Sequence, residues 1–351
     1  MLYNGKNPHG GDIYGQKIIL DFSANTNPLG IPEGVKRAIR DSLETLDRYP
    51  DPFCRRLGEA LAGHEGVPVE YLICGNGAAE VIYAYCAAVG GPGGLVAAET
   101  APTFAEYSLA LENAGCRIIR YPLKAENSFD LDSGFLDFLK AEKPDIIFLC
   151  NPNNPTGRLI EEGLLLEIIK YCGENKIRFF LDECFLDLSD GGRDAKDLLR
   201  DNPHLFILKA FTKSYGIAGV RLGYGMTSDK ELLEKMAKAV QPWNVSSIAQ
   251  AAGIAALKET EFLEDARRLI SCERAWMKAQ LEGLGYYTTD SKTNYLLFKA
   301  EENLAEKLLG KGIAIRKCDN YHGLCSGWFR TAVRTHKENE QLINAIKEIK
   351  A

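Results

Sequence analysis

A lysine and an arginine within residues 211–224 have the chemistry and the spacing to hold a cofactor. Lys213 follows an apolar run at 205–208 that is typical of a buried strand, and its small and hydroxylated neighbours leave the amine free to reach a ligand. Arg221 comes eight residues later, between two glycines that let the backbone pass close to another group. A lysine that forms a Schiff base and an arginine that binds phosphate are what pyridoxal phosphate (PLP) requires of a protein. Taken alone, both residues also fit solvated surface charges, and the nearby Lys209 is interpreted as a strand-edge residue.

The segment 150–157, Cys-Asn-Pro-Asn-Asn-Pro-Thr-Gly, predicts a rigid loop at the end of a strand. It follows strand-like residues 145–150, and its two prolines exclude both a helix and a sheet ladder. A simple turn needs only one Pro-Asn or Asn-Gly pair, so this sequence holds more than a turn requires. The loop therefore offers the side chain of Asn154 as a hydrogen-bond donor at the carboxyl end of the strand.

Asp182 ends a third strand-like run, in which Phe179, Phe180 and Leu181 indicate an apolar interior. A carboxylate buried there is costly unless a cation lies beside it. A protonated pyridine nitrogen is such a cation, and keeping it protonated makes PLP an electron sink. The alternative for this segment alone is an aspartate that caps the next helix.

The elements that must position these residues alternate between strand and helix. Helical periodicity, for example at 161–175, separates predicted strands that begin near Tyr71, Leu95, Cys116, Asp145, Ile177, Leu205 and Val220. This alternation predicts a largely parallel sheet with helices on both faces, and ligands bind such sheets beyond the carboxyl ends of the strands. From 241 the pattern becomes one long helical stretch to Leu284. Three strand-like runs at 295–299, 313–318 and 329–335 and a helix at 338–349 follow, which indicates a small α+β domain.

In this order and spacing, the three segments resemble those of the class I/II aminotransferase superfamily, the PLP-dependent enzymes of fold type I. The resemblance covers nearly the whole chain and implies an α/β fold. Its large domain would hold a mainly parallel seven-stranded sheet, beside a small C-terminal α+β domain. The expected parts are an N-terminal arm at 1–35 that contributes to the small domain and the active site, a large PLP-binding domain at 36–240 and the small domain at 241–351.

The same resemblance implies the cofactor and its ligands. PLP would be bound covalently by Lys213, with Asp182 at its pyridine nitrogen, Asn154 as donor to its 3-hydroxyl oxygen and Arg221 at its phosphate. It further implies phosphate contacts from the amides of Gly77, Ala78 and Ala79 at a helix N-terminus, from the hydroxyl of Thr212, and from Tyr49 of a neighbouring subunit, so that a homodimer is expected. Phe104 would stack on the cofactor ring, with Tyr107 as the alternative.

Two terminal motifs narrow the substrate. The start His-Gly-Gly at 9–11 can form a backbone concavity suited to an oxyanion, although glycines near a terminus also form flexible leaders. Arg316 and Arg330 lie on adjacent strand-like runs and can converge on one site. One arginine suits a carboxylate, and a second arginine together with His9 suggests a substrate that also carries a phosphate.

Together these motifs resemble those of the L-threonine-O-3-phosphate decarboxylases of cobalamin synthesis, which are related to the histidinol-phosphate aminotransferases. On that resemblance the substrate residues are His9, Gly10, Asn25, Asn154, Arg316 and Arg330. Transamination of histidinol phosphate with 2-oxoglutarate is the alternative reaction, and a PLP-binding protein without catalysis is a third possibility that the intact lysine, aspartate and arginine argue against.

Phe185 separates the two reactions only in part. Transaminases of this superfamily usually have a tyrosine at this position, three residues after the aspartate, where its hydroxyl bonds the 3-hydroxyl oxygen of PLP. A phenylalanine removes that donor and resembles the decarboxylase pattern. The choice of reaction is expected to lie instead with the way in which the arginines hold the carboxylate.

The amino-acid composition agrees with an enzyme that acts on a small molecule. The 351 residues are 46% hydrophobic, enough for a large core, and a net charge of −6 without a basic stripe argues against nucleic acid and anionic membranes as partners. Ten cysteines without a Cys-x-x-Cys pair predict buried reduced thiols and no metal site. Polar residues at 4–7 interrupt any apolar leader and no run spans a bilayer, so a cytoplasmic protein is expected.

Overall fold

The computed structural model describes residues 9–15, 17–91 and 93–350. Residues 1–8, where the expected N-terminal arm begins and on which the expectation about a leader depends, lie outside the described part. No helix within the described part is long and apolar enough to cross a membrane.

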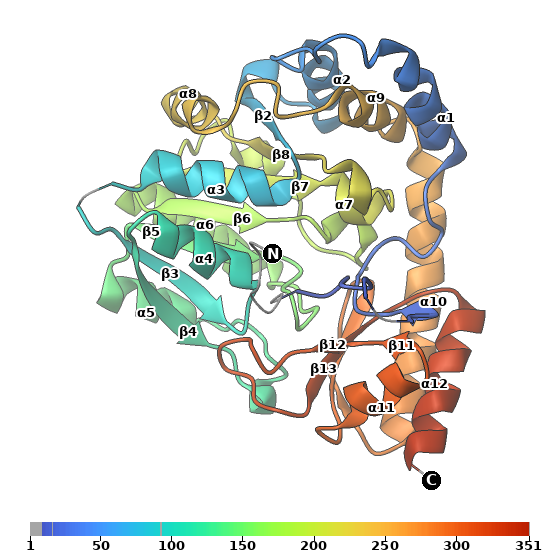
Figure 1. Ribbon diagram of the computed structural model, residues 1–351. Coiled ribbons are helices and arrows are strands. Elements are labelled where there is room, and N and C mark those ends of the chain that lie inside the picture. The colour runs from blue at the N-terminus through green and yellow to red at the C-terminus, as the bar shows by residue number, and fades with distance from the viewer. Residues whose placement is uncertain (1–8, 16, 92, 351) are drawn as a thin grey trace.

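The central element is a seven-stranded sheet with strand order β2-β8-β7-β6-β5-β3-β4 (Figure 1). Its strands are β2 (Leu72–Gly75), β3 (Val96–Ala101), β4 (Arg117–Pro122), β5 (Ile146–Cys150), β6 (Arg178–Asp182), β7 (Leu205–Ala210) and β8 (Gly223–Met226). All pairs are parallel except those of β8, which runs antiparallel to both β2 and β7. The prediction of a mainly parallel seven-stranded sheet is therefore confirmed.

The start of β8 differs from the expected position near Val220 by three residues. A 3₁₀ turn covers Ala218–Val220, and Arg221 then adopts a left-handed backbone with φ 61°. Arg221 therefore precedes β8, which begins at Gly223, and its side chain lines the cavity at the end of the sheet.

Helices cover both faces of the sheet because each buried strand presents apolar residues to both sides. One face packs against α3 (Ala78–Val89), α4 (Ala105–Asn113) and α8 (Lys230–Ala239). The opposite core includes residues of α2 (Arg55–Glu65), α5 (Gly134–Glu142), α6 (Glu162–Asn175), α9 (Ser247–Ala256) and the short α7 (Phe211–Ser214). The helix α1 (Glu33–Ser42) packs against α9 at the rim of this layer.

A second, smaller unit is built on the antiparallel sheet β12-β13-β10-β9. Its strands are β9 (Tyr287–Thr288), β10 (Tyr295–Lys299), β12 (Arg316–Lys317) and β13 (Trp328–Ala332). A separate parallel pair joins β1 (Leu20–Asp21) to β11 (Ile313–Ala314). The helices α11 (Leu304–Gly310) and α12 (His336–Lys350) and the end of α10 (Thr260–Gly283) enclose a core of its own.

Two predictions about this C-terminal part are corrected. The single helical stretch to Leu284 is two helices, α9 and α10, separated by a short break at 257–259. The single strand at 313–318 is split at Ile315 into β11 and β12, which pair with different neighbours. The split allows β11 to receive the N-terminal arm, while β12 lies beside β13.

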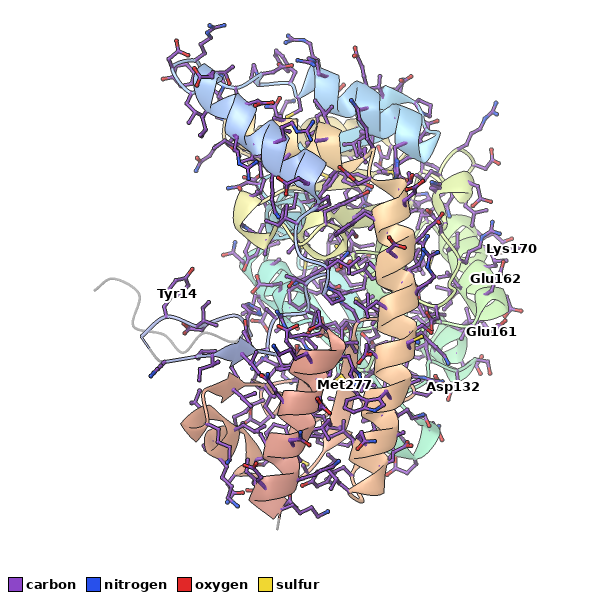
Figure 2. All side chains as sticks on the ribbon, turned by 90° about the vertical axis from the view of Figure 1, so that its right-hand side faces the viewer. Tyr14, Asp132, Glu161, Glu162, Lys170 and Met277 are labelled. Carbon is purple, nitrogen blue, oxygen red and sulfur yellow. The ribbon has the colours of Figure 1, made fainter. Side chains whose placement is uncertain are left out.

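The long helix α10 belongs to both units. Leu263, Ala266 and Ile270 pack in the core of the large unit, whereas Met277 and Leu281 pack in the small one. Figure 2 shows α10 running the height of the molecule, with Met277 in its lower half. The packing thus favours a boundary within α10 over one at residue 241, and the division into 1–35, 36–240 and 241–351 stays a prediction.

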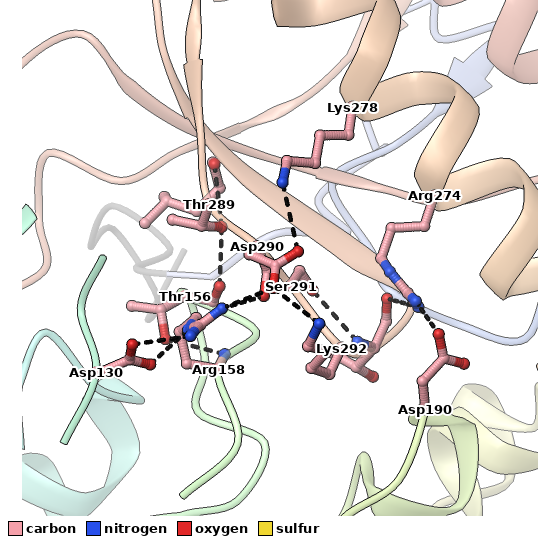
Figure 3. Close-up of polar contacts among 12 residues, drawn as sticks. Asp130, Thr156, Arg158, Asp190, Arg274, Lys278, Thr289, Asp290, Ser291 and Lys292 are labelled. Atoms are coloured by element: carbon pink, nitrogen blue, oxygen red, sulfur yellow. Dashed lines mark hydrogen bonds and ion pairs between the residues drawn. The ribbon is translucent and has the colours of Figure 1, made fainter. Parts of the chain in front are cut away.

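A polar seam joins the loop after β5 to the residues before β10 (Figure 3). Arg158 donates to both carboxylate oxygens of Asp130 at 2.6 and 2.8 Å and to the carbonyl of Asp290 at 2.6 Å. The hydroxyl of Thr289 donates to the carbonyl of Thr156 at 2.9 Å. Because these contacts begin two residues after Asn154, the seam fixes that loop against the small unit.

The ten cysteines are all free, but the expectation that they are buried is wrong for two of them. Cys272 and Cys325 are exposed, while seven others are buried and Cys74 is half-buried. The interpretation of Lys209 as a strand-edge residue is also wrong, because β7 is an interior strand. The ammonium of Lys209 lies 2.8 Å from Asp194 and 3.2 Å from Glu65. A buried lysine is tolerated there because carboxylates surround it.

The seam generates a stability prediction at Gly157. A Cβ added to this residue would lie 2.0 Å from the hydroxyl oxygen of Ser291, and its φ of +71° is already unfavourable for other residues. We expect Gly157→Ala to destabilise the fold by about 2–5 kcal/mol, from backbone strain and overpacking together. Gly191→Ala is the matched control, because φ is +86° there but nothing lies within 4 Å. Equal melting temperatures for the two variants would contradict a close contact at the seam.

Candidate active site

A cavity of about 220 Å³ opens where β5, β6 and β7 end, between the sheet and the small unit. The last residue of each of these three strands lines it. The described residues around the cavity are His9, Gly10, Ser23, Ala24, Asn25, Ala78, Ala79, Ile82, Phe104, Cys150, Asn154, Asp182, Cys184, Phe185, Ala210, Thr212, Lys213, Arg221, Arg316, Tyr321 and Arg330. Its position at the carboxyl ends of the strands is the one that parallel sheets use for ligands.

The cavity brings together most of the residues that the sequence singled out. Thirteen of the fifteen predicted site residues line it, from the N-terminal arm, the large sheet and the small unit. Gly77 and Tyr49 do not. The roles given to these residues by family resemblance stay predictions, but their convergence is a property of the fold.

Lys213 lies in the four-residue helix α7, directly after β7, and not in an open turn. Burial lowers the pKa of its amine to about 8, and the positive charges of Arg330 and Arg221 act in the same direction. Near neutral pH a far larger fraction of this amine is therefore uncharged than in an ordinary lysine, and the uncharged form is the nucleophile. Its nitrogen lies 5.7 Å from the centre of the Phe185 ring.

Asp182 lies at the end of β6 and is 5% exposed. Burial raises the pKa of its carboxyl, while hydrogen bonds from Cys184 and Tyr107 oppose that rise. The amide of Cys184 donates to one oxygen at 2.9 Å, and the hydroxyl of Tyr107 donates to the other at 2.5 Å. Both contacts fix the carboxylate, which can accept a further proton-bearing partner from the cavity.

Arg330 on β13 is the best-held cation of the site. Its guanidinium donates to the side-chain oxygen of Asn154 and, at 3.0 Å, to the carbonyl of Ser23. With its amide oxygen turned toward the guanidinium, Asn25 accepts from Nε at 3.0 Å. These acceptors are neutral oxygens, and among the described residues no carboxylate pairs with Arg330. Its charge is therefore available to an anionic ligand.

The same contact orients Asn154. Its side-chain oxygen accepts from Arg330 and, at 3.3 Å, from the hydroxyl of Tyr321. The amide nitrogen is then the end of the side chain that is left to act as a donor toward the cavity. This orientation agrees with the predicted donor role, which it does not by itself test.

Arg316 lies directly opposite Arg330, because these two residues are register partners in the antiparallel pair of β12 and β13. Both residues line the cavity, so the fold brings the two arginines together there. Arg316 is 9% exposed, donates to Asn320 at 2.7 Å and lies over the ring of Tyr321 at 5.4 Å.

The start of α3 lies at one corner of the cavity, where the free amides of a helix N-terminus favour an anion. Ala78 and Ala79, the first two residues of the helix, line it together with Thr212 and Arg221. Gly77 precedes the helix, and an added Cβ would lie 2.4 Å from the Arg221 guanidinium, so glycine permits that close approach. The amide of Gly77 itself donates to the carbonyl of Gly75 at 2.8 Å, which leaves its predicted contact to phosphate untested.

The sides of the cavity are apolar. Phe104, directly before α4, lines it at the position predicted for ring stacking, whereas Tyr107 turns away and bonds Asp182. Phe185 packs edge-on against Tyr295, with ring centres 5.0 Å apart. No hydroxyl stands at position 185.

Tyr49 lies outside the cavity of its own chain. Its side chain is 79% exposed and stacks on Trp243, with ring centres 4.6 Å apart. An exposed aromatic pair in this place is compatible with a role in a neighbouring subunit, which stays a prediction.

Sequence reasoning missed several residues of the site. Ser23, Tyr321 and Cys184 contact Arg330, Asn154 and Asp182 respectively. Tyr321 lies close to Arg316 in the sequence, but a hydrogen bond between residues 167 positions apart leaves no local signal.

The charges of the cavity suit anions, and its chemistry fits PLP. The described residues around it include four basic side chains, Lys213, Arg221, Arg316 and Arg330, and one carboxylate, Asp182. A lysine with a lowered pKa, a buried carboxylate and a helix N-terminus beside an arginine are the partners for the aldehyde, the pyridine nitrogen and the phosphate of the cofactor. Within the described residues, no cluster of three or more His, Cys, Asp or Glu side chains is placed to hold a metal ion.

Comparison with known proteins agrees with this geometry. The family model for aminotransferase class I and II matches residues 17–346. A threonine-phosphate decarboxylase from Salmonella typhimurium is 36% identical, over 97% of this chain and 96% of its own length. The structure of a histidinol-phosphate aminotransferase from Clostridium acetobutylicum superposes with a TM-score of 0.87 at 29% identity, covering 95% of this chain and 99% of that one. A histidinol-phosphate aminotransferase from Sinorhizobium meliloti in complex with pyridoxal-5'-phosphate shares the fold, with a TM-score of 0.84 at 22% identity, over 96% and 92% of the two chains.

The chain therefore belongs to the class I/II aminotransferase family and has the PLP-dependent transferase fold type I. It is a PLP-dependent enzyme. Its relatives include both decarboxylases and aminotransferases, so the family fixes the cofactor and leaves the reaction open.

We predict that apoprotein takes up PLP covalently at Lys213, with a rate that rises with pH and levels off above about pH 8. The free amine is the nucleophile, and its pKa of about 8 lies well below the ordinary value for lysine. Borohydride reduction and peptide mapping should place the label on Lys213, and Lys213→Ala should abolish it. A label at Lys209, which carboxylates hold in its charged form, or a rate still rising at pH 10 would contradict the assignment.

We also predict a graded loss of turnover at the carboxylate. Asp182→Asn should lose about 3–4 kcal/mol of transition-state stabilisation, or about two to three decades in rate, with a smaller loss of PLP affinity. Tyr107→Phe should lose about tenfold, because one hydrogen bond to a charged group disappears. Tyr85→Phe is the control, since this buried hydroxyl in the same aromatic cluster has no partner among the described residues. Equal turnover in the two Phe variants would make Tyr107 a packing residue only.

Proposed function

We propose that the chain decarboxylates L-threonine O-3-phosphate to (R)-1-amino-2-propanol phosphate for cobalamin synthesis. The observation that carries this proposal is the register pair of Arg316 and Arg330, two buried arginines on adjacent strands that face one cavity. A substrate with a carboxylate and a phosphate on one small skeleton needs two such cations at once. The identity with the Salmonella decarboxylase supports the same reaction.

Arg330 is the proposed carboxylate ligand. Its side chain is buried and bonded to neutral oxygens, so a carboxylate would complete its electrostatic environment. A guanidinium can bind a carboxylate through two parallel hydrogen bonds and thereby fix its plane. Asn25 and Asn154, which hold Arg330, are proposed to orient the substrate through it and through their own amides.

Arg316, His9 and Gly10 form the proposed phosphate end. Arg316 reaches the cavity from the small unit, whereas His9 and Gly10 reach it from the N-terminal arm. A Cβ on Gly10 would lie 2.3 Å from the carbonyl oxygen of Ser23, so the arm lies flat against the segment that holds Arg330. The two anionic groups of the substrate would then be bound side by side.

The family resemblance supplies the proposed cofactor ligands, most of which line the same cavity. Lys213 would bind PLP covalently, Asp182 would hold its pyridine nitrogen, Asn154 would donate to its 3-hydroxyl oxygen and Phe104 would pack on its ring. The proposed phosphate ligands of the cofactor are Gly77, Ala78, Ala79, Thr212, Arg221 and Tyr49 of a neighbouring subunit.

When bound, PLP accepts the electron pair that remains on the substrate when a bond to Cα breaks. In the proposed reaction the bond from Cα to the carboxylate carbon breaks, CO₂ leaves, and the electron pair stays on the Cα side. Arg330 would select this bond by fixing the orientation of the substrate carboxylate. The amine of Lys213 then returns a proton to Cα, which completes the amine product.

Transamination of histidinol phosphate is the second candidate. The structural likeness to the Clostridium acetobutylicum aminotransferase favours it, and a phosphate site would serve either substrate. Phe185 favours decarboxylation, because aminotransferases usually have a tyrosine at this position and phenylalanine lacks its hydroxyl. One experiment separates the two: the holoenzyme is incubated with threonine phosphate, or with histidinol phosphate and 2-oxoglutarate, and CO₂ and glutamate are measured separately.

We further propose a homodimer in which Tyr49 reaches the PLP phosphate of the neighbouring subunit. Its high exposure and its stacking on Trp243 leave the hydroxyl outside its own cavity. A cytoplasmic location also stays a prediction. Sedimentation would test the dimer, and Tyr49→Phe should weaken PLP binding without altering the melting temperature of the apoprotein.

We predict that reaction choice depends on Arg330 more than on residue 185. Arg330→Lys replaces a planar two-pronged donor with a point charge, so the carboxylate angle should loosen and decarboxylation should fall steeply. Abortive transamination should then appear as pyridoxamine phosphate. Phe185→Tyr should change the absorbance of the bound cofactor, because a phenol stabilises the 3-oxygen anion, but should leave that angle unchanged.

The measurement is the ratio of CO₂ released to pyridoxamine phosphate accumulated in each variant. A larger change of this ratio in Phe185→Tyr than in Arg330→Lys would refute the proposal that the arginine selects the bond.

A further inference from the structure

His9 of the N-terminal arm is held by a carboxylate that the reaction described above does not use. Its Nε2 lies 2.5 Å from Oε1 of Glu106, in a contact that joins positions 97 residues apart. Glu106 stands in the first turn of α4, two residues after Phe104, whose ring centre is 5.6 Å from that of His9. The side chain of Glu106 is 14% exposed and that of His9 is 32% exposed.

Glu106 is a carboxylate at neutral pH. The hydrogen bond from His9 holds the pKa of Glu106 below its usual range, and the hydroxyl of Tyr83 acts in the same direction. Since a carboxylate only accepts hydrogen bonds, the proton of this contact lies on Nε2 of His9. The imidazole is therefore fixed in both its orientation and the position of that proton.

The arm is also held on its other side. The amide of Gly11 donates to the hydroxyl of Ser23 at 2.7 Å, and the carbonyl of Ser23 accepts from Arg330. The arm thus crosses the cavity between α4 and the arginine of the small unit. His9 lines the cavity, whereas Glu106 is not among the described residues that line it. Of the two contacting side chains, only the imidazole lines the space proposed for the substrate.

We propose that Glu106 is a positioning residue, which anchors the arm through His9 and orients the imidazole toward the phosphate of the substrate. This inference rests on the proposed function, in which His9 and Arg316 bind that phosphate. The arrangement has a second consequence. A carboxylate beside an anion site is unfavourable unless its charge is covered, and here the His9 ring covers it.

The substitution Glu106→Gln should therefore have opposite effects on phosphate binding in the native protein and in a His9→Asn variant. In the native protein, Glu106→Gln removes the carboxylate that orients His9 and should weaken phosphate binding. In a protein that already carries His9→Asn, the uncovered carboxylate repels the ligand, so adding Glu106→Gln should strengthen binding. Removal of a purely structural contact would give independent losses or a shared loss of stability, without this change of sign.

The test is a double-mutant cycle on the PLP-loaded enzyme, with His9→Asn, Glu106→Gln and the double variant. Inorganic phosphate is the probe, titrated by calorimetry, and KM and kcat for threonine phosphate are measured in parallel. Glu106→Gln should weaken phosphate about tenfold, as expected for a hydrogen bond to a charged group, and raise KM similarly with kcat within about twofold. Glu112→Gln, an exposed carboxylate on the same helix, is the control and should change neither.

The inference is overturned if Glu106→Gln leaves phosphate binding unchanged, if it lowers kcat and not affinity, or if the double variant binds phosphate more weakly than His9→Asn alone. The proposed function fails separately. If threonine phosphate is not decarboxylated but phosphate binding shows the expected change of sign, the positioning role stands and the assigned substrate is wrong. If phosphate does not bind the native holoenzyme, the positioning role fails, while the CO₂ assay alone decides the proposed function.

Discussion

The guanidinium of Arg330 is the contact on which the rest of the site depends. It is rooted in the small unit and binds oxygens from Ser23 and Asn25 of the arm and from Asn154 of the large unit. A buried cation is costly unless its donors are satisfied, so the three segments must meet for the fold to be stable. Because the acceptors are neutral, the charge remains for a ligand, and the same contact that closes the structure creates an anion site.

The start of α4 connects three parts of the site: the cavity wall, the N-terminal arm and the carboxylate at the end of β6. Within four consecutive residues, Phe104 lines the cavity, Glu106 holds the arm through His9, and Tyr107 bonds Asp182. A helix start keeps such side chains at fixed angles to one another. The polar seam at Arg158 does the same for the loop that carries Asn154. Parts of the site that lie far apart in the sequence are therefore held by short, rigid segments.

The sequence predicted the large sheet well because each buried strand is a short apolar run between loops. The same criterion failed where packing, and not composition, decides. The sequence favours Lys209 as a strand-edge residue, because the partners Glu65 and Asp194 that make its burial possible come from distant segments. The run 313–318 looks like one strand, but Ile315 turns the chain between two different neighbours.

By itself the sequence determined the fold class, the cofactor and most of the residues around the cavity, because local motifs at strand ends fix which side chains reach the carboxyl edge of the sheet. It could not determine that the side-chain oxygen of Asn154 accepts from Arg330, that Tyr107 bonds Asp182, or that Glu106 contacts His9. These are pairings between side chains 75 to 176 positions apart. Only the tertiary structure decides them, because a hydrogen bond depends on where two segments meet and leaves no periodicity in either one.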